Sequence, residues 1–158
     1  MISIIVAMDN DYLIGKKDSD NGMPWHNKED LKHFKETTLH HTILMGATTY
    51  KAIGRPLPNR HTIVVSRHGI DDERVEVRNS LEDVLKEYQG NQKDLYITGG
   101  ASIYEQALPY VDELLISKIP GKHEGETYFP HFDQYDFELV ETKHFETFTL
   151  EIYRRGTK

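Results

Sequence analysis

Short apolar runs alternate with segments of helical periodicity along most of this chain, and that alternation restricts its fold more than any other feature. The first run, residues 2–8, is apolar almost without interruption, which is typical of a strand covered on both faces of a parallel sheet. Further strands are expected at residues 42–45, 62–66 and 95–98, and helices at residues 28–38, 48–53, 80–88 and 101–108. The β-α-β-α order predicts a doubly wound, mostly parallel α/β sheet, with helices on both faces and ligands at the carboxyl ends of the strands.

The C-terminal part follows a different pattern. Residues 137–153 indicate two strands, and in the second of them Phe148, Leu150 and Ile152 alternate with Thr149 and Glu151. An antiparallel element is therefore expected to close one edge of the sheet. The chain contains no internal repeat, low-complexity tract or Pro/Ser-rich linker, so residues 1–158 are expected to form a single domain.

Composition excludes several classes of function. The chain carries 19 Lys and Arg against 26 Asp and Glu, a formal net charge of −7, whereas nucleic-acid binders usually present a basic face. It has no cysteine, which excludes disulfides, thiol nucleophiles and cysteine-ligated metals. The nine histidines show no His-x-x-x-His spacing, so no metal is expected. No apolar run is long enough to span a bilayer, and we expect a cytoplasmic monomer without membrane or nucleic-acid partners.

Asp30 has two interpretations. Asn27 precedes the periodic residues Leu31 and Phe34, so Asn27 can cap a helix and Asp30, three residues later, can complete a capping box. Residues four apart share a helix face, however, which puts Asp30 on the same stripe as Phe34. If that stripe lines a cavity, desolvation raises the pKa of the carboxyl and makes it available for proton chemistry.

Two glycine turns each follow an expected strand and precede an expected helix. Gly99 and Gly100 form one and Gly46 the other, and glycine lets the backbone approach a ligand closely. Each turn alone is weak evidence, because no G-x-G-x-x-G fingerprint is present. Together, at the ends of parallel strands, the two turns suit the halves of a ligand bridged by a pyrophosphate.

Arginines occur at two further turns. Residues 54–60 form a rigid turn in which Arg60 could clamp a carboxylate in bidentate fashion, whereas Arg55 is interpreted as a solvated side chain. His68, beside Arg67 after a strand, could join a phosphate site. The chain has neither a Gly-x-Ser-x-Gly elbow nor a phosphate-binding loop, so serine hydrolase and nucleoside-triphosphatase functions are unsupported.

Taken together, these motifs resemble those of the dihydrofolate reductase family, in the same order over nearly the whole chain. The matching segments are Ile5-Val6-Ala7, Leu13-Ile14-Gly15, Met23-Pro24-Trp25, Asp30-Leu31 with Phe34-Lys35, Met45-Gly46, residues 53–60, Gly99-Gly100 with Ile103-Tyr104, and residues 124–130. The resemblance implies a doubly wound α/β enzyme in which NADPH gives a hydride to the pterin of dihydrofolate and yields tetrahydrofolate.

The resemblance also implies roles for individual residues on the substrate side. Asp30 would hold the pterin and favour protonation at N5, Ser117 would hydrogen-bond Asp30, and Trp25 would hold an ordered water nearby. Whether the carboxyl donates the proton or water delivers it is left open. The substrate would also contact Ile5, Val6, Leu31, Phe34, Lys35, Ile53, Leu57, Arg60 and Thr98, with Arg60 pairing with the glutamate carboxylate.

The cofactor side is implied in the same way. NADPH would contact Ala7, Ile14, Gly46, Ala47, Thr48, Thr49, Ser66, Arg67, Gly99, Gly100, Ala101, Ser102, Ile103 and Tyr104, with Arg67 at the 2′-phosphate. Residues 9–24 would form a lid over the nicotinamide.

This chain departs from the family pattern in three places. Ala47 stands where many family members have arginine, Thr98 stands where an apolar residue is common, and residues 16–21 lengthen the lid. The alternatives are a reductase of the same fold acting on another heterocycle, and a dinucleotide-binding module without activity.

Overall fold

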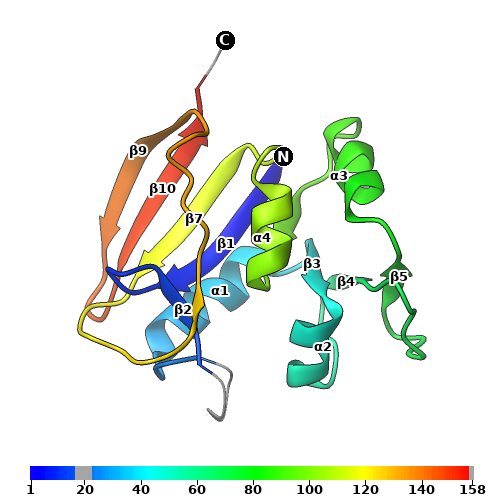
Figure 1. The fold of residues 1–158 in the computed structure, drawn as a ribbon, viewed down its shortest axis with the longest axis horizontal. Helices are drawn as coiled ribbons and strands as arrows, with labels where there is room; N and C mark the ends of the chain where they lie inside the picture. Colours follow the sequence, from blue (N-terminus) through cyan, green and yellow to red (C-terminus); the bar gives the residue numbers. More distant parts are fainter. Residues whose placement is uncertain (17–22, 157–158) are drawn as a thin grey trace.

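The computed structural model describes residues 1–16 and 23–156, which build one eight-stranded sheet flanked by helices (Figure 1). The sheet has the order β5-β4-β3-β6-β1-β7-β10-β9. Its first six strands in that order are Glu76–Arg78 (β5), His61–Val65 (β4), Thr42–Gly46 (β3), Leu95–Ile97 (β6), Ile2–Met8 (β1) and Glu113–Lys118 (β7). Neighbours among these six pair in parallel, as predicted.

Helices cover both faces of the sheet. They are Lys28–Thr38 (α1), Ala47–Ile53 (α2), Leu81–Gln89 (α3) and Ala101–Ala107 (α4). All seven residues of β1 are buried, and Ile4 and Met8 pack in one cluster with side chains of α3 and α4. Ile5 and Ala7 alternate to the opposite face, where the packed side chains include Phe34 of α1. This two-sided burial confirms the doubly wound α/β architecture.

The C-terminal strands turn the sheet antiparallel at one edge, as predicted. Thr149–Arg155 (β10) pairs antiparallel with β7, and Phe137–His144 (β9) pairs antiparallel with β10. Thr149 lies opposite Lys118, which in turn lies beside Met8 of β1. The turn between β9 and β10, residues 145–148, is therefore at the carboxyl ends of β1 and β7.

Three short strands were not predicted. β5 has only three residues, all half-buried, and two of them are charged, so no apolar run marks it. Leu13–Gly15 (β2) and Thr127–Tyr128 (β8) form a separate two-stranded sheet. Their pairing joins segments more than 100 residues apart, which local periodicity cannot reveal.

Candidate active site at the carboxyl ends of β1 and β7

The first turn of α1 carries the acid singled out in the sequence. The Asn27 side chain caps the helix, because its Oδ1 accepts a hydrogen bond from the backbone N–H of Asp30 at 2.9 Å. The predicted cap is therefore confirmed, and it employs only the backbone of Asp30. The carboxylate of Asp30 remains available for other partners.

The Asp30 side chain faces β7. Its carboxylate accepts a hydrogen bond from the hydroxyl of Ser117, a residue that is 2% exposed. Burial raises the pKa of the Asp30 carboxyl, and the bond from Ser117 and the nearby His33 offset part of that rise. The site thus contains a carboxyl group that retains its proton at a higher pH than a solvated aspartate does.

Apolar side chains surround this carboxyl. Trp25 is buried in the same cluster as Ile5, Ala7 and the half-buried Phe34. The Trp25 ring also meets His123 edge-on, with 5.0 Å between ring centroids. The resulting environment is apolar with few polar groups, as small-molecule sites usually are.

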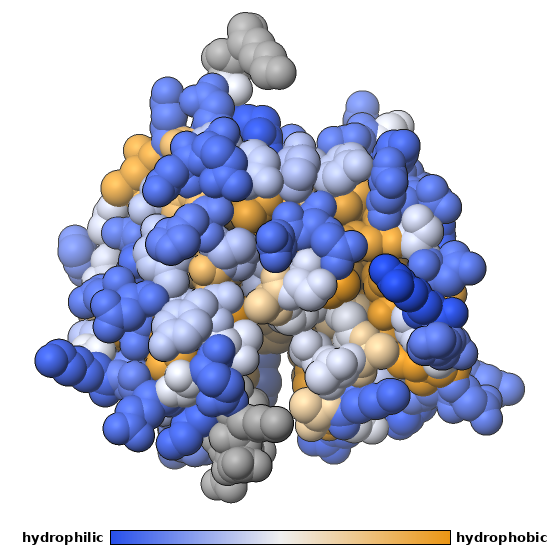
Figure 2. Space-filling view, in the orientation of Figure 1, coloured by the Kyte–Doolittle hydropathy of each residue, from blue (hydrophilic) through white to orange (hydrophobic). Residues whose placement is uncertain are grey.

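Other residues of the expected substrate pocket are open to solvent. Leu31 is 51% exposed and Ile53 is 41% exposed, while Leu57 is half-buried. In Figure 2 a notch opens at the lower edge of the molecule, and its wall at the position of α2 in Figure 1 is pale and orange. Exposed apolar side chains of this kind are expected where a ligand, and not the protein itself, covers them.

The expectation for Val6 needs a correction. Strand residues alternate between faces, so the Val6 side chain packs with Ile4 and Met8 in the cluster of α3 and α4. Ile5 and Ala7 point to the other face. Any contact of Val6 with a ligand on that face must use its backbone.

Arg60 is held by the end of α1. Its Nε donates to Thr38 Oγ1 at 2.8 Å, one terminal nitrogen donates to the Pro58 carbonyl at 2.6 Å, and the other donates to the carbonyl of Lys35. Burial lowers the pKa of Arg60. A guanidinium has five N–H donors, so these three bonds fix its direction and leave two donors for an anion. The Lys35 side chain itself is exposed.

The two glycine turns lie against each other. The Gly46 N–H donates to the Gly99 carbonyl at 2.9 Å. A Cβ at Gly46 would lie 3.1 Å from the Ile103 side chain, and a Cβ at Gly100 would lie 3.3 Å from Thr49 Oγ1. Gly99 has φ +133°, a conformation that side chains disfavour. The turns therefore form a backbone cradle in which glycine is needed.

Both helices that follow the cradle begin without a side-chain cap, at Gly46 for α2 and Gly100 for α4. Tyr104 anchors α4 below the cradle, since its buried hydroxyl donates to the Ile5 carbonyl at 3.1 Å. Thr98, where an apolar residue is common in the family, donates its hydroxyl to the Leu44 carbonyl at 3.2 Å. Its polar atom is thus satisfied inside the sheet.

Most of the remaining residues expected at the cofactor lie at the N-termini of α2 and α4. Ala47 and Ala101, the first residues of α2 and α4, are half-buried, whereas Thr48 and Ser102 are exposed. Ile14 is half-buried in β2.

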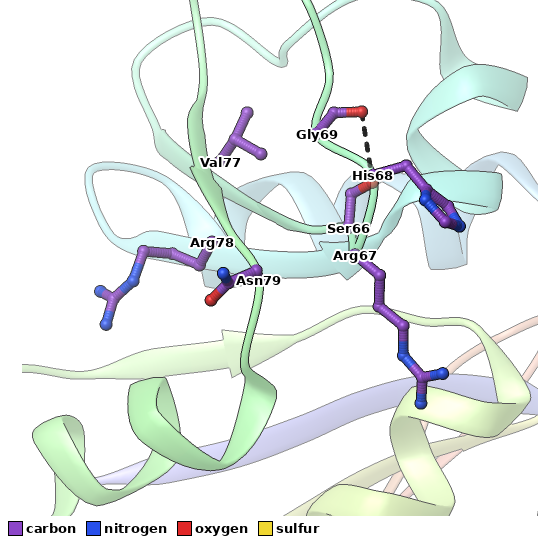
Figure 3. A pocket seen from close by; sticks show the side chains of 7 residues that line it. All are labelled: Ser66, Arg67, His68, Gly69, Val77, Arg78 and Asn79. Atoms are coloured by element: carbon purple, nitrogen blue, oxygen red, sulfur yellow. Dashed lines mark hydrogen bonds between the residues drawn. The ribbon is translucent and has the colours of Figure 1, made fainter.

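A hollow of about 440 Å³ lies beyond the end of β4. It is lined by Ser66, Arg67, His68, Gly69, Val77, Arg78 and Asn79 (Figure 3). Ser66, Arg67 and His68 were expected near a phosphate from the sequence, whereas Arg78 and Asn79 were not, because they come from the short strand β5 and the residue after it. In Figure 3 the side chains of Arg67 and Arg78 extend in opposite directions, and Arg78 pairs with Glu76 at 3.2 Å and Glu87 at 3.1 Å. Arg67 is exposed.

The expected lid is only partly described, because residues 17–22, and with them most of the insertion at 16–21, lie outside the described residues. Its first part is ordered by Asp9, whose Oδ1 accepts N–H bonds from Asp11 at 2.8 Å and Leu13 at 3.0 Å. β2 then pairs with β8, and the Glu126 N–H donates to the Gly15 carbonyl at 3.3 Å.

Within residues 1–16 and 23–156, no group of three or more His, Cys, Asp or Glu side chains could hold a metal ion. No helix in this part of the chain is long and apolar enough to cross a membrane.

Comparisons with known proteins agree with this geometry. The family model for dihydrofolate reductase matches residues 1–155. The dihydrofolate reductase of Bacillus subtilis is 44% identical over 144 residues, which are 90% of this chain and 83% of that one. The dihydrofolate reductase of Staphylococcus aureus is 38% identical over 140 residues, or 88% and 84% of the two chains. A solved structure of dihydrofolate reductase from Enterococcus faecalis, complexed with NADP(H) and RAB-propyl, superposes with a TM-score of 0.88 at 34% identity and covers 99% of this chain and 97% of that one. This chain belongs to the dihydrofolate reductase family.

Proposed function

We propose that this protein reduces 7,8-dihydrofolate to 5,6,7,8-tetrahydrofolate with NADPH. The observation that carries the proposal is the Asp30 carboxylate, bonded by Ser117 at an apolar site between α1 and β7. A family member without reductase activity would have no need for a half-buried carboxyl there. Burying such a group without a ligand to pair with costs stability.

Asp30 is the residue that recognises the pterin. Its carboxylate can accept hydrogen bonds from the pterin's amino group and ring N–H. The hydrogen bond from Ser117 holds the carboxylate in the orientation that this requires. Holding these groups increases the basicity of the pterin ring and so favours protonation at N5. Trp25, buried beside them, shields the site and can orient a water.

The side walls orient the rest of the substrate. Ile5 and Phe34 form the apolar floor, and Leu31 and Ile53 are exposed toward solvent until a ligand covers them. The two unused donors of Arg60 suit a carboxylate at the far end of the substrate. Dihydrofolate has a carboxylate on its glutamate tail.

The residues of the two glycine turns fit NADPH. Side chains at Gly46 and Gly100 would crowd Ile103 and Thr49, and a turn without side chains can let a ligand approach the backbone closely. Ser66 and Arg67 supply a hydroxyl and a guanidinium donor that suit the phosphate of the adenosine end. When bound, NADPH supplies the hydride, and Ala7 and Ile14 would contact its nicotinamide.

The test is the loss of NADPH absorbance on addition of dihydrofolate, measured beside NADH. Oxidation that depends on dihydrofolate is the expected result, and the ratio of the rates with NADPH and NADH reports whether Arg67 compensates for Ala47. Oxidation with another heterocycle but not with dihydrofolate would move the chain to a different substrate. NADPH binding without oxidation by any pterin would indicate a binding module.

We further propose that the protein acts as a monomer in the cytoplasm. The net charge of −7 supports a protein that does not self-associate. Light scattering on the purified protein, across about a hundredfold range of concentration, tests the monomer.

A further inference from the structure

The β9–β10 turn, residues 145–148, is tied to the first turn of α1 by a group of hydrogen bonds between residues about 120 positions apart. The Thr147 N–H donates to Glu29 Oε1 at 2.8 Å, and the Thr147 hydroxyl lies 2.7 Å from the same oxygen. The Asn27 side-chain amide donates to the Thr147 carbonyl at 3.2 Å. A further N–H, that of Glu146, also reaches the Glu29 carboxylate.

Glu29 is the centre of this group. Because Thr147 and Glu146 donate to its carboxylate, the pKa of Glu29 is held below its ordinary value, and Glu29 stays ionised through the neutral range. Hydrogen bonds to a charged acceptor are the stronger kind. The Glu29 carboxylate is therefore a charged acceptor for the Thr147 bonds through the neutral range.

The same bonds reach the helix cap. The Thr147 hydroxyl lies 3.0 Å from Asn27 Oδ1, the atom that accepts the N–H of Asp30. The hydroxyl has one hydrogen to share between Glu29 and Asn27, and the shorter distance favours Glu29. The Asn27 amide completes the link, because it donates to the Thr147 carbonyl and accepts the N–H of Asp30, so Thr147 is two hydrogen bonds away from the backbone of the acid.

Aromatic contacts reinforce the attachment. The His33 ring, on the next turn of α1, lies 5.8 Å from the ring of Phe148 and 6.3 Å from that of Phe145. Phe145 and Phe148 stack on each other at 4.5 Å. The turn therefore contacts α1 on both sides of Asp30 along the helix. At the lower left of Figure 1, the ends of β9 and β10 lie beside α1.

We propose that Glu29 and Thr147 are positioning residues of the reaction: they hold the first turn of α1 against the β9–β10 turn so that the Asp30 carboxylate faces Ser117. The inference rests on the proposed function, because it assigns these residues a role in that reaction. Neither residue touches the pterin or the cofactor. They act through the cap of α1, which carries Asp30.

The charged groups around Asp30 determine which measurement detects a shift of the first turn of α1. His33 faces Asp30 from the same helix, and Lys143 of β9 and Glu36 of α1 in turn face His33. A shift of the first turn changes how deeply Asp30 is buried and how well Ser117 reaches it. The pH profile of turnover reports both changes, whereas a loss of stability alone does not move it.

The test compares Thr147→Val, which keeps the shape and the N–H but lacks the hydroxyl, with Thr147→Ser, which restores the hydroxyl. Thr147→Val and Glu29→Ala are expected to lower kcat roughly fivefold to tenfold, displace its pH profile and speed hydrogen exchange at the Asp30 amide. KM for NADPH is expected to stay unchanged, and Thr147→Ser is expected to behave as wild type. Glu82→Ala is the matched control, because Glu82 occupies the same position in the first turn of α3 and pairs with exposed Lys86 of its own helix, at 2.8 Å.

Two results would overturn the proposal. In the first, the wild type reduces dihydrofolate but Thr147→Val and Glu29→Ala keep its pH profile and Asp30 amide exchange, even if they melt earlier. The contact would then be structural only. In the second, the wild type does not reduce dihydrofolate, which overturns the proposed function and this inference with it. The wild-type assay therefore separates the two failures.

Discussion

Helices α1 and α3 begin with the same arrangement of residues on opposite faces of the sheet. In each, a polar N-cap side chain accepts the N–H of an aspartate three residues later, Asn27 from Asp30 at 2.9 Å and Ser80 from Asp83 at 3.2 Å. Each also has a glutamate between the two, Glu29 in α1 and Glu82 in α3. The local sequence therefore specifies two equivalent helix starts.

The helices differ in what packs against those starts. Asp83 is exposed, whereas the Asp30 carboxylate accepts a bond from Ser117 of β7 and has a raised pKa. Glu82 pairs with Lys86 of its own helix, whereas Glu29 bonds Thr147 of a distant turn. The comparison shows that a capping pattern gives a helix, and that tertiary packing turns one of its carboxylates into a functional group.

The strongest test of the difference between the two helix starts is to replace each aspartate by asparagine. Asp30→Asn is expected to lower kcat at about pH 7 by roughly 100-fold to 10,000-fold, the range for loss of a proton-transfer group, because the amide cannot replace the charge that holds the pterin. Asp83→Asn is expected to leave kcat unchanged. Steady-state kinetics with both variants, alongside NADPH titration to verify folding, provide the measurement. Equal activity of Asp30→Asn and wild type across pH would remove Asp30 from the mechanism.

Much of this comparison was accessible from the sequence, and part was not. The strand at residues 2–8 and the cap at Asn27 were predicted because periodicity and capping depend on neighbours in the chain. The bond between Thr147 and Glu29 was not, because nothing in a local pattern relates residues 118 positions apart.

Side-chain exposure was harder to predict than secondary structure. Leu31 and Ile53 were expected in an apolar pocket and are about half exposed, because no neighbouring protein segment covers them in the described part of the chain. Val6 was placed with Ile5 and Ala7 by the family motif, and strand alternation sends its side chain to the other face. Motifs indicate which residues occur together, and the two-residue period decides which of them share a face.

The second prediction concerns the other end of α1. Arg60 bonds Thr38 and the Lys35 carbonyl there, whereas the arginine at the last turn of α3, Arg78, is already paired with the Glu87 carboxylate at 3.1 Å. Arg60→Leu is expected to weaken dihydrofolate binding roughly 10-fold to 100-fold, because a charge-assisted bond to a carboxylate contributes about 1.5–3 kcal/mol. NADPH affinity should change little. Binding of each ligand is measured by fluorescence titration, with Arg55→Leu in the same turn as the control. Equal losses for both ligands would place Arg60 outside the substrate site.

The third prediction uses the raised pKa of Asp30. In the unfolded chain this carboxyl ionises near its ordinary pKa of 3.8, and in the folded chain it ionises at a higher pH. The folded state therefore binds the proton more tightly, so Asp30 lowers the stability of the wild type as pH rises from that ordinary value through the folded pKa. Asp30→Asn lacks this loss, and its Tm relative to wild type is expected to increase over the same pH range. Calorimetry is expected to show no such trend for Asp83→Asn. Parallel curves of Tm against pH for wild type and Asp30→Asn would contradict the raised pKa of Asp30.

The smallest expected effect distinguishes the contribution of the N-cap to stability from its contribution to the reaction. Asn27→Ala and Ser80→Ala each remove one N-cap acceptor, which typically costs about 1 kcal/mol of unfolding free energy, so denaturant unfolding should show similar losses for both. Their effects on the reaction should differ. Asn27 holds the N–H of Asp30 and lies beside Thr147, so its loss is expected to shift the pH profile of kcat as well. Ser80 caps a helix whose first-turn carboxylates, Glu82 and Asp83, are exposed to solvent, so Ser80→Ala should be less stable and fully active. Equal kinetics in the two variants would mean that the start of α1 is as purely structural as the start of α3, and that Asp30 is aligned by β7 alone.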